Sequence, residues 1–210
     1  RDLARSMLCD YLADAILMPY AAFRAAAQET RHDLERLQRR FGVRFEQVCR
    51  RLTTLQRPGA KGIPFHLVRV DMAGNVTWRF SASGIRIARH GGVCALWNLH
   101  ATFLAPAGIR TQVSRMPDGT TYFSMAWTVR DEEATTLRSP RLSALELGCE
   151  ASFAGEIGYA DGIDVDAAAI VVPIGTTCRL CERADCSQRV LPAFHPLLPS
   201  TRGRAVGNHS

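Results

Sequence analysis

The first sixty residues repeat apolar side chains at helical spacing. The first such pattern begins at Leu3 and ends before Pro19, because proline cannot continue a helix. A second helix is predicted from about Ala21, and Thr30-Arg-His-Asp33 is typical of the capping box that starts a third. A fourth helical pattern consists of Phe45, Val48, Cys49, Leu52 and Leu55. These residues predict four helices, the last ending at Arg57-Pro58-Gly59.

From Ile63 the apolar period changes to two, which indicates β-strands. One predicted hairpin joins residues 64–71 to 76–81 through Met72-Ala-Gly-Asn75. A second joins residues 109–116 to 120–130 around Pro117-Asp-Gly119. Three further elements are expected: an edge strand over residues 84–88, a helix over 93–104 and a strand over 142–147.

This order of elements predicts an α+β fold. An antiparallel sheet with helices, placed after a helical segment, is typical of small sensory domains of the GAF or PAS kind. We expect four parts: a helical segment (1–60), a GAF/PAS-like ligand-sensing domain (61–145), a cysteine-rich metal-binding segment (146–195) and a disordered tail (196–210).

Three cysteines lie within nine residues near the C-terminus. Cys178 and Cys181 are separated by two residues, and Cys181 and Cys186 by four, a spacing that lets thiolates converge on one metal centre. A fourth ligand must come from elsewhere. Cys149 is our first choice, and His195 and Cys94 are alternatives.

Cysteine spacing alone leaves the kind of centre open. Four thiolates suit a structural zinc ion and an iron–sulfur cluster equally well, and one disulfide beside a free thiol is a further alternative. Nearby arginines, Arg179, Arg183 and Arg189, would offset the charge of either thiolate centre.

Composition narrows the class of protein. The chain has 210 residues, 47% of them hydrophobic, and contains no apolar run of the roughly 18 residues that cross a bilayer. Seven cysteines with one tight cluster fit a reducing cytoplasm better than a secreted disulfide framework. The net charge of +6 comes from 25 Arg and one Lys, and such a surface favours phosphate-bearing partners. Because the chain does not begin with Met, we expect an excised fragment.

Motifs of common enzyme classes are absent from the sequence. No His-Glu-x-x-His, Gly-x-Ser-x-Gly, Walker-type loop or Gly-x-Gly-x-x-Gly occurs, so we expect no catalytic activity. An acyl-coenzyme A-processing enzyme is the weaker alternative, with Cys94 or His100 as its nucleophile or base. Residues 34–48 have the pattern of a helix-turn-helix. A zinc-stapled DNA-binding or scaffold domain is therefore a further alternative function.

Several segments together resemble one protein family. They are Leu17-Met-Pro-Tyr20, Arg40-Phe-Gly-Val43, Arg51-Leu-Thr-Thr-Leu-Gln-Arg-Pro58, Arg69-Val-Asp-Met-Ala-Gly-Asn75, Gly91-Gly-Val-Cys-Ala-Leu-Trp97 and Ile174-Gly-Thr-Thr-Cys-Arg-Leu-Cys-Glu-Arg183. The chain is similar to the C-terminal region of actinobacterial short-chain-fatty-acid transcriptional regulators, which join an N-terminal helix-turn-helix to an ImmA/IrrE-like segment. On this resemblance, residues 1–60 are the tail of the ImmA/IrrE-like part, and a DNA-reading domain lies upstream.

The resemblance implies a ligand-sensing domain that regulates propionate or short-chain fatty acid metabolism. Its ligand would be acyl-coenzyme A, and a 4Fe-4S cluster would be held by Cys149, Cys178, Cys181 and Cys186. Zinc is the alternative cofactor, and assembly of the chain into a homo-oligomer is a further alternative. Coenzyme A carries several negative charges, so its pocket should offer basic groups at the mouth and apolar walls. The candidate contacts are Arg57, Lys61, Arg69, Arg79, Arg86 and Trp97, with Trp78 and Phe103 as further walls.

Overall fold

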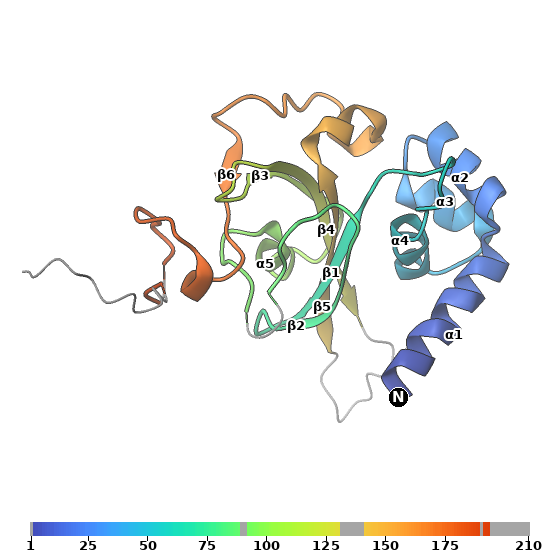
Figure 1. Ribbon diagram of the computed structural model, residues 1–210, viewed down its shortest axis with the longest axis horizontal. Helices are drawn as coiled ribbons and strands as arrows, with labels where there is room; N and C mark the ends of the chain where they lie inside the picture. Colours follow the sequence, from blue (N-terminus) through green and yellow to red (C-terminus); the bar gives the residue numbers. More distant parts are fainter. Residues whose placement is uncertain (1, 89–91, 131–140, 190, 194–210) are drawn as a thin grey trace, which may run out of the picture.

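A six-stranded sheet separates two layers of the molecule (Figure 1). The computed structural model describes residues 2–88, 92–130, 141–189 and 191–193. The sheet order is β2-β1-β5-β4-β3-β6, from strands β1 (His66–Asp71), β2 (Val76–Ser81), β3 (Arg110–Arg115), β4 (Thr121–Arg130), β5 (Leu142–Glu150) and β6 (Val171–Pro173). All neighbouring strands pair antiparallel except β3 and β6. The predicted α+β class is confirmed, and so are both hairpins.

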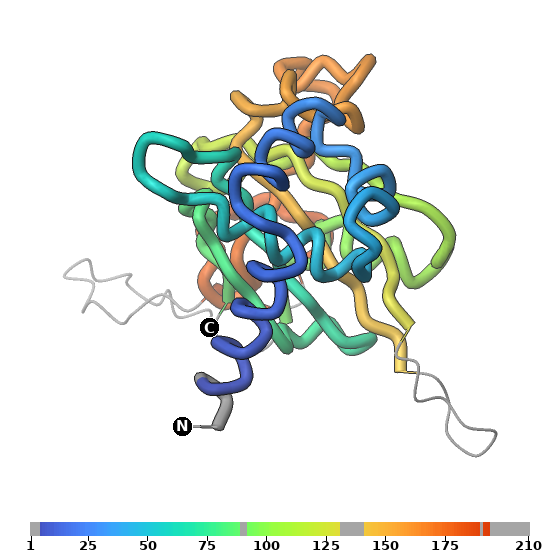
Figure 2. Tube along the Cα trace, turned by 90° about the vertical axis from the view of Figure 1, so that its right-hand side faces the viewer, coloured from blue at the N-terminus to red at the C-terminus, as the bar shows by residue number. Residues whose placement is uncertain are grey.

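Four helices cover one face of the sheet (Figure 2). They are α1 (Asp2–Leu17), α2 (Tyr20–Glu29), α3 (Leu34–Phe41) and α4 (Phe45–Thr53). Gly42 ends α3 in the left-handed conformation, with φ of 62°, which costs glycine little. The expected capping box at Thr30 is wrong in its position: Asp33 caps α3, while Thr30 ends α2 and donates back to the Ala26 carbonyl.

Alternation along the strands gives each face its own core. On β5, Leu145, Leu147 and Cys149 pack with the helices α2 to α4. Directly before them, Ala144 faces the other way and packs with Trp97 and Leu99 beside the short helix α5 (Asn98–Thr102). Side chains that alternate along one central strand therefore belong to different layers.

Three expectations from the sequence need correction. Residues 84–88 form no strand, and the helix expected over residues 93–104 is limited to α5. The strand over 142–147 extends to Glu150. Strand β6 was not expected. Among the described residues, the 3-10 helices η1 (Ala151–Glu156) and η2 (Gly158–Ala160) precede β6, and η3 (Cys178–Leu180) follows it. The tail 196–210 and the ligand candidate His195 lie outside the described residues.

Candidate functional site

The three clustered cysteines meet a fourth thiol in space. Cys178, Cys181 and Cys186 line one small cavity together with Cys94, which lies just before α5. Cys94 and Cys181 are buried, and the other two are half-buried. All four thiols are unpaired, so the disulfide alternative has no counterpart here. The C-terminal loop is thus packed against the layer that contains α5.

Hydrogen bonds from arginine side chains to backbone carbonyls hold this loop in place. The Arg189 guanidinium donates to the carbonyls of Cys178 (3.1 Å), Cys181 (3.2 Å) and Arg183. Arg183 in turn donates to the carbonyl of Arg115 at 2.8 Å, which ties the loop to β3. Two of the arginines expected to balance thiolate charge therefore also fix the course of the chain around the thiols.

Cys149, our first choice for the fourth ligand, lies on the opposite face of the sheet. Its side chain is fully buried in the core beneath the helices, near Ala154 and Ile157. Burial raises the pKa of its thiol far above the usual range, and Glu156 and Glu150 act in the same direction. The structure does not bring Cys149 together with the other three, because β5 directs it away from the loop.

Four thiols around one cavity are a donor set that suits a zinc ion or an iron–sulfur cluster. Within the ranges that the structure describes, no three Cys, His, Asp or Glu side chains are placed to hold one metal ion. A tetrahedral zinc ion needs its four sulfurs about 3.8 Å apart, whereas each thiolate of a cluster binds a different iron. The cavity measures about 10 Å³, which is roughly the space of one water, so the loop must move outward to admit a cluster.

A larger pocket opens where the helices meet the sheet. It has a volume of about 400 Å³, within the range of ligand pockets. Apolar walls come from Ile63, Pro64, Ala82 and Phe153. The polar lining residues are Gln28, His32, Gln56, Lys61 and Glu156.

Lys61 contributes a cationic side chain to the lining of this pocket, which we call the junction pocket. Lys61 lines it, and its carbonyl accepts a hydrogen bond from the Arg24 guanidinium at 3.2 Å. Arg57 stacks over the Tyr20 ring, 4.4 Å from its centroid, and donates its N–H to the Tyr20 hydroxyl. Tyr20 donates onward to Ala60 at 2.9 Å. The segment between α4 and β1 is thereby held in place, and its residues Arg57 and Lys61 are exposed.

The remaining coenzyme A candidates lie away from the junction pocket. Arg69 on β1 pairs with Glu46 at 3.6 Å, and Arg79 donates to the carbonyls of Ile87 and Ala88. Trp97 is buried in the core beside α5, while Arg86 is exposed near the C-terminal loop, where its carbonyl accepts from Thr176. Arg24, which was not among the candidates, lies one helical turn before Gln28, a residue of the pocket lining.

The segment with the helix-turn-helix pattern, residues 34–48, packs against the rest of the protein. In α4, Phe45 contacts the Trp127 ring edge-on, and Arg50 donates to the buried carboxylate of Asp14 at 2.9 Å. Arg51 is buried and donates to the Met18 carbonyl. A helix whose side chains are committed to the core in this way is not free to enter a groove of DNA.

Two family models together match nearly the whole chain. The family model described as "Short-chain fatty acyl coenzyme A regulator, C-terminal" matches residues 54–205, and the IrrE N-terminal-like domain matches residues 3–53. The boundary between them falls at the end of α4. Among the described residues, no helix combines the length and apolar content that a bilayer crossing requires.

Curated relatives are transcriptional regulators by name. The "Propionyl-CoA carboxylase regulator" of Cereibacter sphaeroides is 46% identical over 206 residues, which are 97% of this chain and 44% of the relative. The HTH-type regulators PrpR and RamB of Mycobacterium tuberculosis are 44% and 43% identical over 91% and 92% of the chain. These matches span 40% and 41% of the two relatives. The chain therefore spans less than half the length of the curated relatives it matches.

A solved structure has the same fold. A "Mycobacterium tuberculosis transcriptional regulator" superimposes with a TM-score of 0.86 at 43% identity, covering 91% of this chain and 59% of the other. Because the family model matches well over half of the residues, this chain belongs to the short-chain fatty acyl coenzyme A regulator family.

Proposed function

We propose that this chain is the ligand-sensing part of a transcriptional regulator of propionate or short-chain fatty acid metabolism, and that it binds acyl-coenzyme A in the junction pocket. The observation that carries the proposal is the combination of apolar walls at Ile63, Pro64 and Phe153 with the Lys61 ammonium group in the same lining. Pantetheine and acyl groups suit such walls, and phosphates suit guanidinium and ammonium groups. Propionyl-CoA is the natural probe, since a relative is named for its carboxylase.

Lys61 is the residue whose loss should weaken binding most clearly. A charged hydrogen bond to a phosphate contributes about 1.5–3 kcal/mol, so Lys61→Gln should raise the Kd for propionyl-CoA at least about tenfold in isothermal titration calorimetry. The matched control is Arg110→Gln, which removes the same charge from an exposed position on β3. Equal affinities of the two variants, or no binding by the unaltered chain, would contradict the proposal.

We further propose that Cys94, Cys178, Cys181 and Cys186 hold a 4Fe-4S cluster. The proposal is supported by the shared cavity of the four thiols and by the guanidinium of Arg189 beside them. When bound, such a cluster supplies a redox- and oxygen-sensitive centre. The residues of this chain would orient its thiolates and keep the C-terminal loop against α5.

Iron and sulfide counts decide between the two candidate fourth ligands. Purified without oxygen, the chain should carry about four irons and four sulfides. Cys94→Ser and Cys181→Ser should lose most of this iron, whereas Cys149→Ser should keep it. A colourless protein with one zinc would reject the cluster, and iron loss only in Cys149→Ser would restore Cys149 as the ligand.

DNA recognition belongs to the whole regulator in this proposal. The relatives PrpR and RamB are named HTH-type, and the part of them that this chain matches is less than half. We therefore assign DNA contact to a domain outside the matched region, and the cytoplasm as the compartment. The sheet with helices on both faces would act as a sensor of the GAF or PAS kind.

A further inference from the structure

The turn between α2 and α3, residues 30–33, contributes to the wall of the junction pocket. His32 of this turn and Gln28 of α2 line the pocket together with Phe153 and Glu156 of η1. The first two residues belong to the part of the chain that matches the IrrE N-terminal-like domain, and the last two to the part that matches the regulator family. A ligand that fills this pocket therefore contacts both parts.

Hydrogen bonds join the turn to the segment after β5. His32 Nδ1 lies 3.1 Å from the carbonyl oxygen of Glu156, so two lining residues of the pocket are in direct contact. The Gly158 N–H donates to the Arg31 carbonyl at 2.8 Å. The backbone of the turn is thereby bonded to η1 and η2.

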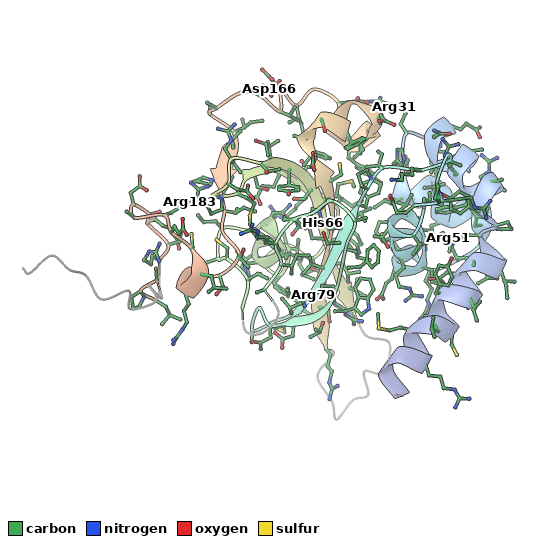
Figure 3. All side chains as sticks on the ribbon, viewed as in Figure 1. Arg31, Arg51, His66, Arg79, Asp166 and Arg183 are labelled. Atoms are coloured by element: carbon green, nitrogen blue, oxygen red, sulfur yellow. The ribbon has the colours of Figure 1, made fainter. Side chains whose placement is uncertain are left out.

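Side chains strengthen the same connection. The Arg31 guanidinium donates to the Asp161 carboxylate at 2.8 Å and to the Gly155 carbonyl at 3.0 Å. The Leu34 N–H, at the start of α3, donates to the Tyr159 hydroxyl at 3.2 Å. Figure 3 shows Arg31 where the helical layer meets the 3-10 helices that follow β5.

The backbone of the turn is strained. Arg31 and His32 have φ of 50° and 59°, in the left-handed region that residues with a Cβ disfavour. Such conformations persist where surrounding contacts hold them, and they are concentrated at ligand clamps and switch regions. Here the surrounding contacts are the bonds to η1 and η2, so loss of these bonds should let the turn relax and withdraw His32 from the pocket wall.

The connection is weak enough to be reversible. The side chains of Arg31 and Asp161 are 46% and 63% exposed, and an exposed ion pair contributes little stability. His32 is buried, and its ring meets the Phe65 ring edge-on with the centroids 5.7 Å apart. Opening of the turn would expose this histidine, whereas a ligand in contact with both His32 and Glu156 would keep the turn closed.

We propose that the Arg31-His32 turn is a clamp that closes the junction pocket around its ligand. The inference rests on the proposed acyl-coenzyme A site. Arg31, Tyr159 and Asp161 are positioning residues: they do not line the pocket, and they hold His32 against Glu156. A bound ligand shifts the turn toward the closed state. Because binding and closure favour each other by the same factor, loosening the clamp weakens binding.

Two substitutions of opposite charge test the clamp in the full chain. Arg31→Gln removes a positive charge and Asp161→Asn a negative one, and each breaks the same ion pair. Charge alone predicts that anionic coenzyme A binds more weakly to Arg31→Gln and more tightly to Asp161→Asn. The clamp predicts instead that both variants raise the Kd for propionyl-CoA about threefold in isothermal titration calorimetry, as expected for the loss of an exposed ion pair.

Glu35→Gln is the matched control for Asp161→Asn. It also removes a carboxylate from an exposed ion pair, that between Glu35 and Arg39 in α3, but leaves the clamp intact. Glu35→Gln should bind propionyl-CoA at least as tightly as the unaltered chain does.

Hydrogen exchange measured by mass spectrometry reports the clamp directly. The Gly158 amide is bonded to the Arg31 carbonyl, so exchange in a peptide of residues 155–161 follows opening of the turn. Saturating propionyl-CoA should slow this exchange about threefold, and both clamp variants should accelerate it without ligand. Exchange of residues 122–127 in the central strand β4 should not change and is the internal reference.

The possible outcomes separate the clamp from the proposed function. Absence of propionyl-CoA binding by the unaltered chain rejects the acyl-coenzyme A site, and the clamp with it. Binding with equal or higher affinity in Asp161→Asn rejects only the clamp, and so does unchanged exchange of residues 155–161 on binding. Melting curves show whether the variants are folded. If Asp161→Asn is not, Tyr159→Phe, which removes the acceptor of the Leu34 N–H, replaces it and should also weaken binding.

Discussion

Glycine at position 175 makes room for a cysteine. A Cβ there would lie 2.7 Å from Cys181 Sγ and 3.1 Å from its Cβ, a closeness that side chains do not tolerate. The position has an ordinary backbone conformation, so space alone requires glycine. Close approach of the backbone to a thiol is a recurrent use of this residue.

Gly175→Ala should therefore displace Cys181 and disturb metal binding. We expect the iron content per chain to fall by at least half, measured on protein purified without oxygen. Gly155→Ala is the control, because a Cβ at Gly155 meets nothing within 4 Å. Equal iron contents in the two variants would mean that the loop accommodates the extra methyl group.

Sequence spacing predicts three thiols of the candidate metal centre and leaves the fourth ligand open between Cys149, His195 and Cys94. The pattern Cys-x-x-Cys-x-x-x-x-Cys is local, so it could be read directly. The choice between Cys94 and Cys149 depends on which face of β5 a residue occupies. Leu145 and Leu147 alternate with Glu146, which already indicated that Cys149 shares the apolar face, but the position of the loop could not be derived from any local pattern.

At the scale of single elements, α3 depends on its cap. Asp33 accepts the Arg36 N–H at 2.9 Å and thereby satisfies one of the free amide groups at the start of the helix. The helix is only eight residues long, so each terminal bond is a large part of its local stability.

Asp33→Ala should lower the free energy of unfolding by about 1 kcal/mol. Glu35→Ala, in the same first turn, removes only an exposed ion pair to Arg39 and should cost less than about 0.5 kcal/mol. Urea denaturation followed by circular dichroism measures both. If the two losses are equal, the Asp33 cap does not stabilise α3.

Helices and hairpins were predictable because each is marked by nearby residues. Pro19 separates α1 from α2, and Met72-Ala-Gly-Asn75 closes the first hairpin. Strand β6 was missed because its three residues pair in parallel with β3, a partner about sixty positions away. Residues 84–88 have strand-like alternation but find no ladder partner, so alternation alone overpredicted there.

At the scale of the whole molecule, the loop between α2 and α3 joins the helical layer to the segment after β5. Arg31 and His32 both adopt left-handed conformations, with φ of 50° and 59°. Arg31 pairs with Asp161 at 2.8 Å, and its carbonyl accepts the Gly158 N–H. His32 Nδ1 lies 3.1 Å from the Glu156 carbonyl. These contacts bridge the two regions that the family models separate at residues 53 and 54.

This junction should make stability depend on pH. Burial lowers the pKa of His32 below its usual 6.5, so the unfolded chain binds a proton at a higher pH than the folded chain does. The stability that neutral His32 contributes is complete above pH 7 and declines as the pH falls through 6.5. The decline stops below the folded pKa of His32.

His32→Asn should flatten this pH dependence between pH 7.5 and 5.5, because asparagine does not titrate and tolerates a left-handed backbone. Urea denaturation at several pH values measures the slope. The lowered pKa of His100 should leave a residual slope in the variant. An unchanged slope in His32→Asn would place the pH sensitivity elsewhere.

Alternation along β5 has a consequence for the integrity of both proposed functions. Glu146 faces His66 and Cys149 faces the helices only because β5 pairs in one register with β1 and β4. A slip by a single residue would place Glu146 in the aliphatic core and Leu147 opposite His66. A misaligned chain would thus bury an unpaired carboxylate, which makes the correct alignment of this central strand a condition of folding and of sensing alike.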